Sequence, residues 1–156
     1  MFISSLALAF PKLTPTGSWN NGVKDPSLLG SSPVSILTYT PWGYVSANLM
    51  AGESDAKTIP IKVGWPPKSN DSDTDWALVG RSALAYTGPF RLNESVPANE
   101  TQGQIIHGPL TVVSVPSMLG TTITRDYKVY NREDGIYLHL SGRFGTFTAE
   151  AWWRKL

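Results

Sequence analysis

Histidine and tyrosine side chains supply the first candidates for chemistry in this sequence. His107 follows two isoleucines in a β-rich stretch. Its imidazole ordinarily titrates near neutral pH, where it can act as a general acid or base. A hydrogen-bonded structural histidine is the alternative, and the sequence weighs the two equally. Tyr39 ends another β-rich stretch and is a second candidate catalytic group, although most tyrosines in β-rich domains simply form part of a wall.

Arg125 and Glu150 form a candidate charged pair. Arg125 alternates with Ile123 and Tyr127, so the three share one side of a strand. If that side faces inward, the buried guanidinium needs a partner, and we expect Glu150 on a late strand to provide it. There the guanidinium could hold an enolate or polarise a carbonyl. If the side faces outward, Arg125 is an ordinary surface residue.

A set of mostly aromatic side chains is expected to line a ligand pocket. Asn48 and Met50, together with Ser46, form a mixed set that suits a pocket better than a packed core. Such a lining could hold a flexible substrate folded and so reduce the entropic barrier to a cyclisation. The expected lining residues are Trp42, Tyr44, Asn48, Met50, Tyr86, Phe90, Tyr127, Phe144 and Trp152.

The residues present argue against several other kinds of site. The chain has no cysteine and only two histidines, without the spacing of a metal-ligand pair. Neither a phosphate-binding GxxxxGK loop nor a Gly-x-Ser-x-Gly hydrolase motif occurs. The net charge is +1 with dispersed Lys and Arg, which does not favour nucleic acid. We therefore expect no metal, no cofactor and no nucleic-acid partner.

The length of 156 residues predicts a single domain spanning 1–156. Residues 1–12 are either a leader or an N-terminal segment, and 51–73 are an expected loop insertion. Met1–Phe10 is apolar but has no basic start, so it is a poor secretory signal. No apolar run approaches the ~20 residues of a membrane span. We expect a cytoplasmic protein, while the sequons at Asn70, Asn93 and Asn99 leave secretion open.

Short strands separated by turn residues must position these side chains. A helix is expected over 74–85, capped by Ser72 or Asp73, between the third and fourth strands. An all-β domain of eight antiparallel strands can close into a barrel that holds one small ligand, and a two-sheet sandwich is the structural alternative. The expected strands are 18–23, 34–40, 44–50, 90–92 with its lead-in, 104–115, 121–130, 136–140 and 146–154.

Several stretches, in order along the chain, resemble one known family. The hairpin ILTYTPWGYVSANLM is the strongest match, and Trp153-Arg154 fits at the end of the chain. The other matching stretches are LTPTGSW at 13–19, ALAYTGPFRL at 83–92 and IIHGPLTVVSVPSMLGTTITRDY at 105–127. Together they are similar to the single-domain lipocalin-like proteins of bacteria and fungi. The resemblance implies an eight-stranded antiparallel barrel with one short helix.

The resemblance also implies two possible functions. Fungal proteins of this kind act in natural-product pathways as cofactor-free cyclases or isomerases, and some guide cycloadditions. The first expectation is therefore a cofactor-independent cyclase or isomerase for an apolar polyketide- or terpenoid-type intermediate. The alternative is a non-catalytic carrier of a small hydrophobic ligand, and an interaction module is a third, less favoured possibility. A homodimer is left open, and no membrane partner is expected.

Overall fold

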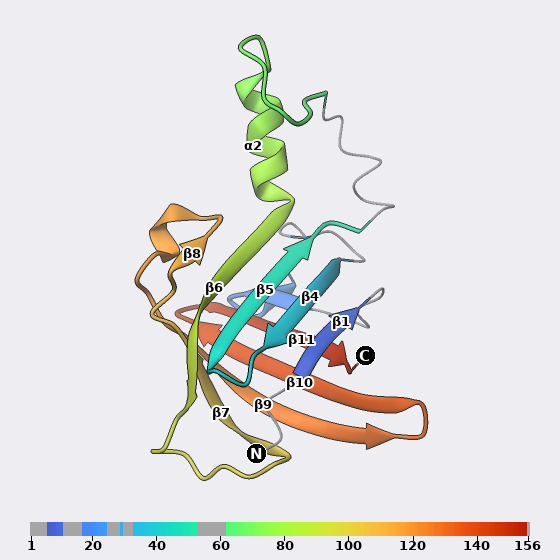
Figure 1. The fold of residues 1–156 in the computed structure, drawn as a ribbon, viewed down its shortest axis with the longest axis vertical. Helices are drawn as coiled ribbons and strands as arrows, with labels where there is room; N and C mark the ends of the chain where they lie inside the picture. Colours follow the sequence, from blue (N-terminus) through green and yellow to red (C-terminus); the bar gives the residue numbers. More distant parts are fainter. Residues whose placement is uncertain (1–5, 11–16, 25–28, 30–32, 53–61, 156) are drawn as a thin grey trace.

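One curled antiparallel sheet makes up most of the chain in the computed structural model, which describes residues 6–10, 17–24, 29, 33–52 and 62–155 (Figure 1). One α-helix, α2 (Asp73–Arg81), and a short 3-10 helix, η1 (Pro116–Met118), interrupt the strands in this part of the chain. The strands are β1 (Leu6–Phe10), β2 (Gly17–Asn20), β3 (Val23–Lys24), β4 (Val34–Tyr39), β5 (Tyr44–Met50), β6 (Ala83–Leu92), β7 (Gln102–His107), β8 (Val112–Val113), β9 (Ile123–Arg132), β10 (Gly135–Phe144) and β11 (Phe147–Arg154).

The order of strands in the sheet follows the chain for most of its length. It runs β1-β4-β5-β6-β7-β9-β10-β11-β2-β3, with β8 paired to β6. The sheet curls so strongly that Cα atoms of β1 come within 8 Å of β11, which gives a lipocalin-like half-barrel. The all-β, antiparallel expectation is confirmed, and one sheet replaces the two separate sheets of a sandwich.

Two of the eight expected strands are divided in the structure. The stretch 18–23 is broken at Asn21-Gly22, whose φ values of 52° and 77° form the turn of the β2–β3 hairpin. Asn-Gly is the dipeptide that such two-residue turns favour, because both positions need positive φ. The stretch 104–115 is broken after His107 by Gly108-Pro109, and β8 then pairs with β6. Strand β1, which falls in the expected leader, is additional and pairs with β4.

The expected helix is present but shorter than predicted. The Ser72 hydroxyl caps it by accepting the N–H of Asp75 at 3.4 Å. The helix ends at Arg81 because β6 begins at Ala83 and pairs with β5 from that residue onward. No residue of α2 is buried, and the helix projects beyond the end of β6 (Figure 1). No helix in the described residues is long and apolar enough to cross a membrane.

Part of the expected insertion at 51–73 can be described. Ala51 and Gly52 are buried at the end of β5, and residues 62–72 have no regular secondary structure. Within it, the backbone N–H of Lys62 bonds to the Asp75 carboxylate at 3.2 Å, which ties the segment to α2. Residues 53–61, the rest of the expected insertion, lie outside the described residues.

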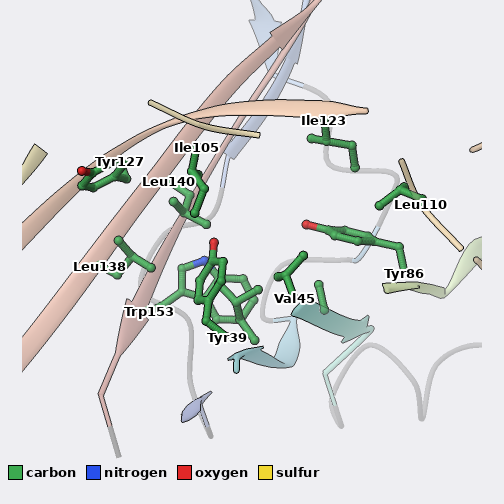
Figure 2. Packing of buried hydrophobic residues seen from close by; sticks show 12 residues of the cluster. Tyr39, Val45, Tyr86, Ile105, Leu110, Ile123, Tyr127, Leu138, Leu140 and Trp153 are labelled. Atoms are coloured by element: carbon green, nitrogen blue, oxygen red, sulfur yellow. The ribbon is translucent and has the colours of Figure 1, made fainter. Parts of the chain in front are cut away.

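The concave side of the sheet carries the hydrophobic core (Figure 2). Alternate residues of each strand point to it, because successive side chains on a strand lie on opposite faces. Each such side chain contributes about 1.5–3 kcal/mol when fully buried. The buried cluster consists of Leu37, Tyr39, Val45, Ala47, Tyr86, Ile105, Leu110, Ile123, Tyr127, Leu138, Leu140 and Trp153.

Candidate functional site

A histidine lies at the centre of this apolar core, held between two tyrosines. His107 ends β7 and is opposite Phe90 on β6 and Ile123 on β9. It is 0% exposed. Its Nε2 lies 2.8 Å from the Tyr39 hydroxyl, and its Nδ1 lies 3.1 Å from the Tyr86 hydroxyl. Strands β4, β6 and β7 therefore bring together three polar groups that are far apart in the sequence.

The protonation of this cluster follows from its burial. Burial, and to a lesser degree the charge of Arg125, lowers the pKa of His107 to about 3, so the imidazole is neutral at pH 7. Burial raises the pKa of Tyr39 and of Tyr86, while the charge of Arg125 acts in the opposite direction. Both phenols are thus neutral as well. A neutral imidazole has one N–H and one lone pair, so one tyrosine donates to the imidazole and the other accepts from it.

The tyrosine that accepts from His107 keeps its own O–H proton. That proton is available to a third group, such as a ligand oxygen. Because either imidazole nitrogen can carry the proton, the direction of the Tyr–His–Tyr chain reverses when the imidazole changes tautomer and both hydroxyls rotate, or when a ligand takes a proton from one tyrosine and returns one to the other. The cluster can therefore act as a hydrogen-bond donor and as a proton relay.

Arg125 lies on the same concave side, next to this cluster. On β9 it is opposite Ile105 of the neighbouring strand β7. It also alternates with Ile123 and Tyr127, which are both buried. Its terminal nitrogen Nη1 is shielded from solvent. Burial lowers the pKa of Arg125, whereas the neighbouring tyrosines raise it. The inward orientation leaves a guanidinium among apolar side chains and close to two phenols.

Gly142 on β10 provides the space that Arg125 occupies. A Cβ built on Gly142 would overlap Nη1 of Arg125 and would lie 3.0 Å from its Cδ and 2.9 Å from the Thr124 carbonyl oxygen. Gly142 falls between the expected strands 136–140 and 146–154, but in the structure it lies within β10. A glycine inside a strand often indicates a close approach by another group, and that pattern could have identified it.

Glu150 is not placed to pair with Arg125, which corrects the expectation. Glu150 is opposite Ser141 on the outer face of the sheet and lies 3.2 Å from Nε2 of His139. Trp152 shares that outer face and stacks on His139, with ring centroids 4.4 Å apart. Because side chains alternate between the two faces of β11, Trp153 points inward where Trp152 points outward. Trp153 is 3% exposed and belongs to the core.

Strand β5 also presents the opposite face from the one expected. Val45 and Ala47 are buried, so the alternating residues point outward. Tyr44 is 51% and Met50 53% exposed, and Asn48 is exposed as well. Trp42, in the preceding turn, is also exposed. These four residues were expected in a pocket lining, but the register of β5 places its apolar residues inside and its mixed polar set outside.

The remaining expected residues have different surroundings. Phe90 contacts Tyr39 edge to face, with centroids 4.9 Å apart, and so supports the cluster. Tyr127 is buried, but its hydroxyl donates to the Asn99 carbonyl at 2.7 Å. It therefore belongs to the wall. The side chain of Phe144 lies outside what the structure describes. Among the expected residues, the structure brings together Tyr39, Tyr86, Phe90, His107 and Arg125.

Comparison with protein families finds a match to the lipocalin-like domain over residues 19–155. Comparisons with curated proteins and with solved structures find no match. The matched span contains the whole cluster around His107. Membership of this family supports a β-barrel domain that binds a small molecule.

Proposed function

The chain belongs to the lipocalin-like domain family, and from that membership and the buried cluster we propose that it binds a small, largely apolar molecule and isomerises or cyclises it without a cofactor. The observation that carries the proposal is His107, held between the hydroxyls of Tyr39 and Tyr86. Apolar packing alone needs no such group, and burying polar atoms costs free energy unless they are bonded. A few converging polar groups in an apolar interior are typical of ligand sites.

A proton relay is the chemistry that this arrangement supports. One tyrosine gives its O–H proton to the ligand and receives the imidazole N–H proton in its place. The other imidazole nitrogen takes the proton of the second tyrosine, whose oxygen removes a proton from a C–H or O–H of the ligand. The cluster ends neutral with the imidazole tautomer exchanged, and the ligand has the same mass with one hydrogen moved.

Arg125 and the apolar surroundings would contribute in two further ways. The guanidinium stabilises negative charge that develops on a ligand oxygen during proton transfer, and such stabilisation is strong where water is excluded. The apolar side chains hold a flexible ligand in one folded conformation, which favours ring closure over open-chain conformers. Isomerisation and cyclisation thus use the same groups.

A carrier is the second candidate function. Apart from the cluster, the buried core of the described residues consists almost entirely of hydrocarbon and aromatic side chains. Such an interior retains an apolar molecule by the hydrophobic effect alone. In that case the cluster around His107 only orients the ligand, and the molecule leaves unchanged.

The test compares products formed with wild-type protein and with matched variants. Purified protein is incubated in D₂O with an extract of apolar carbonyl metabolites, and products are followed by chiral chromatography and mass spectrometry. We expect a new isomer that carries deuterium, formed faster than with boiled protein. Tyr39→Phe and Tyr86→Phe should each lower the rate by about 10²-fold or more.

His139→Phe is the control for these variants. It changes the other histidine of the chain, which lies on the outer face, and its rate should equal that of the wild type. Retention of a metabolite in unchanged form, with no deuterium incorporated, would rule out the enzyme and leave the carrier.

A further inference from the structure

Charged residues are missing from three stretches of the chain whose strands lie side by side. The ranges 33–52, 82–90 and 108–122 contain no Asp, Glu, Lys, Arg or His. They include β4, β5, β8 and all but the last two residues of β6, which are neighbours in the sheet. Charged residues occur instead on α2 and on β9, β10 and β11. Because about 25% of the residues in a typical domain are charged, these strands form a distinct surface.

Apolar side chains are exposed on the outer side of these strands, since the alternate residues fill the core. Ile36 on β4 is 51% exposed, Met50 on β5 is 53% and Val112 on β8 is 65%. On the same side, Ser46 is opposite Thr87 of β6, which is opposite Val112. Exposed apolar residues grouped in this way indicate an interaction surface. We call it the uncharged face, and it includes Ile36, Ser46, Asn48, Met50, Thr87 and Val112.

The polar side chains on the uncharged face can both donate and accept hydrogen bonds. The Thr87 hydroxyl donates to that of Ser46 at 3.1 Å, and the Asn48 amide donates to the same oxygen at 3.4 Å. Hydroxyl and amide groups each have donor and acceptor sites, so each of them can pair with a copy of itself. A charged group cannot do so, because like charges placed opposite each other are destabilising.

These properties favour a second copy of the chain over other partners. An anionic membrane or a nucleic acid would require Lys or Arg on the face, and neutral lipid would leave its hydroxyl and amide groups without partners. A charged protein surface would lose its hydration there without meeting an opposite charge. A two-fold axis brings a surface against a copy of itself, and a face without charge that has both donors and acceptors matches itself.

We propose that two copies of the chain associate through the uncharged face, sheet against sheet, as a dimer with two-fold symmetry. Four strands about 4.8 Å apart and the length of β5 give an area of about 450 Å² per copy. The total is close to the ~1,000 Å² at the lower limit of specific interfaces. We therefore expect a weak dimer, with a Kd of about 1 μM or higher. The proposal is independent of the ligand, because His107 lies on the other side of the sheet.

Sedimentation velocity of the full chain tests the association, at concentrations from about 1 μM to about 500 μM to cover a weak interface. Val112→Glu and Ile36→Glu each place one charge per copy on the uncharged face. Val23→Glu is the matched control, because Val23 is also an exposed valine on a two-residue strand, but on β3 at the end of the strand order. Circular dichroism establishes that each variant is folded, and phosphatidylcholine vesicles are a second probe.

We expect a reversible equilibrium between monomer and dimer in the wild type, without larger species, because a two-fold contact closes at two copies. Val112→Glu and Ile36→Glu should each raise the Kd about tenfold or more, because the introduced charge loses water without gaining a partner. Val23→Glu should keep the Kd of the wild type. The two variants on the uncharged face lie on different strands, so either one is sufficient if the other does not fold.

Four outcomes would overturn the proposal. They are a chain that stays monomeric at every concentration, assemblies that grow beyond two copies, a dimer that neither Val112→Glu nor Ile36→Glu weakens, and a dimer that Val23→Glu weakens equally. A monomer that sediments with phosphatidylcholine vesicles would show that lipid covers the face instead of a second copy. None of these results depends on whether the protein transforms a ligand.

Discussion

His107 lies at the centre of the polar network buried in the interior. Its two ring nitrogens satisfy two buried hydroxyls at once, so the imidazole links β4, β6 and β7 through side chains as well as through the backbone. His139, by contrast, lies on the outer face beside Glu150 and Trp152. The two histidines of the chain thus form a natural comparison.

Replacing His107 with Phe should lower the free energy of unfolding by about 2–6 kcal/mol, because two buried hydroxyls each lose a partner at about 1–3 kcal/mol. His139→Phe keeps an aromatic ring against Trp152 and loses only the partly exposed contact with Glu150, so its effect should stay within about 1 kcal/mol. Urea titration followed by circular dichroism measures both. Equal effects for the two variants would contradict a structural role of the buried network.

The pH dependence of stability should report the same histidine. The pKa of His107 is about 3 in the folded chain and near its ordinary 6.5 when unfolded. Below pH 6.5 the unfolded chain takes up a proton that the folded chain does not. Above pH 6.5, His107 therefore does not change the free energy of unfolding with pH. From there toward pH 3, the free energy of unfolding falls by about 1.4 kcal/mol per pH unit.

The check is a series of urea titrations from pH 7.5 to 4.5 on wild type, His107→Phe and His139→Phe. The surroundings of the carboxylates are not changed directly by His107→Phe, so the difference between its curve and that of wild type isolates His107. The His139→Phe curve is the control for removing a histidine from the outer face, beside Glu150. The decrease in the free energy of unfolding that His107 causes below pH 6.5 should be absent only in His107→Phe. Parallel curves for wild type and His107→Phe would show that the imidazole is not held neutral.

At the scale of elements, the register of a strand decides which residues reach the interior. On β4, Leu37 is 0% exposed and its neighbour Ile36 is 51% exposed. On β5, Val45 and Ala47 point inward while Tyr44 and Asn48 point outward. A shift of one residue would exchange these sets completely, because the side chains of a strand alternate between faces.

Leu37→Ala and Ile36→Ala test this register with neighbouring residues. Leu37→Ala should lower the free energy of unfolding by about 2–5 kcal/mol, because it leaves a cavity in the core. Ile36→Ala should change it by about 0.5 kcal/mol or less. Chemical denaturation of the two variants measures the difference, and a larger loss for Ile36→Ala would show that β4 is in the other register.

Two glycines of contrasting surroundings test how closely the elements pack. A Cβ at Gly142 would meet Arg125 and the backbone of Thr124, whereas a Cβ at Gly80 on α2 would meet nothing within 4 Å. Gly142→Ala should cost about 1–3 kcal/mol of stability through overpacking. Gly80→Ala should stabilise the helix by about 0.5–1 kcal/mol. Urea titration measures the loss of stability in Gly142→Ala. Slower amide hydrogen exchange in α2 would show the stabilisation in Gly80→Ala.

The described part of the molecule is a curled sheet in which the edge strand β1 approaches β11 without pairing with it. Its concave side combines a hydrocarbon core with one polar cluster. An apolar ligand that binds there stabilises the folded chain, because the unfolded chain offers no such site. Ligand binding and resistance to unfolding should therefore rise together.

At a ligand concentration of 100 Kd, the free energy of unfolding should increase by about 2.7 kcal/mol. Thermal denaturation with and without an apolar metabolite that the protein retains measures the shift in Tm. The buried Trp153 should also change its fluorescence, and Trp153→Phe should remove that part of the response. A ligand that leaves Tm unchanged at this concentration would not be bound by the folded sheet.

The local pattern of the sequence determined the class of fold and most of the strands. Alternation and turn residues located eight strands, and Ser72 marked the start of the helix, because each of these depends on neighbours along the chain. The same alternation placed Ile123, Arg125 and Tyr127 on one face. His107 and the tyrosines stood out by chemical type alone.

Only the tertiary structure decided which face of each strand is concave and which distant residues meet. Glu150 and Trp152 were expected inside, yet both lie on the outer face of β11. The neighbouring Trp153 is the residue that points into the core. Partners such as Tyr39 and His107 are 68 residues apart, and their distance depends on the curvature of the sheet and the register between strands. These are properties of the pairing between strands, which no single strand's residues determine.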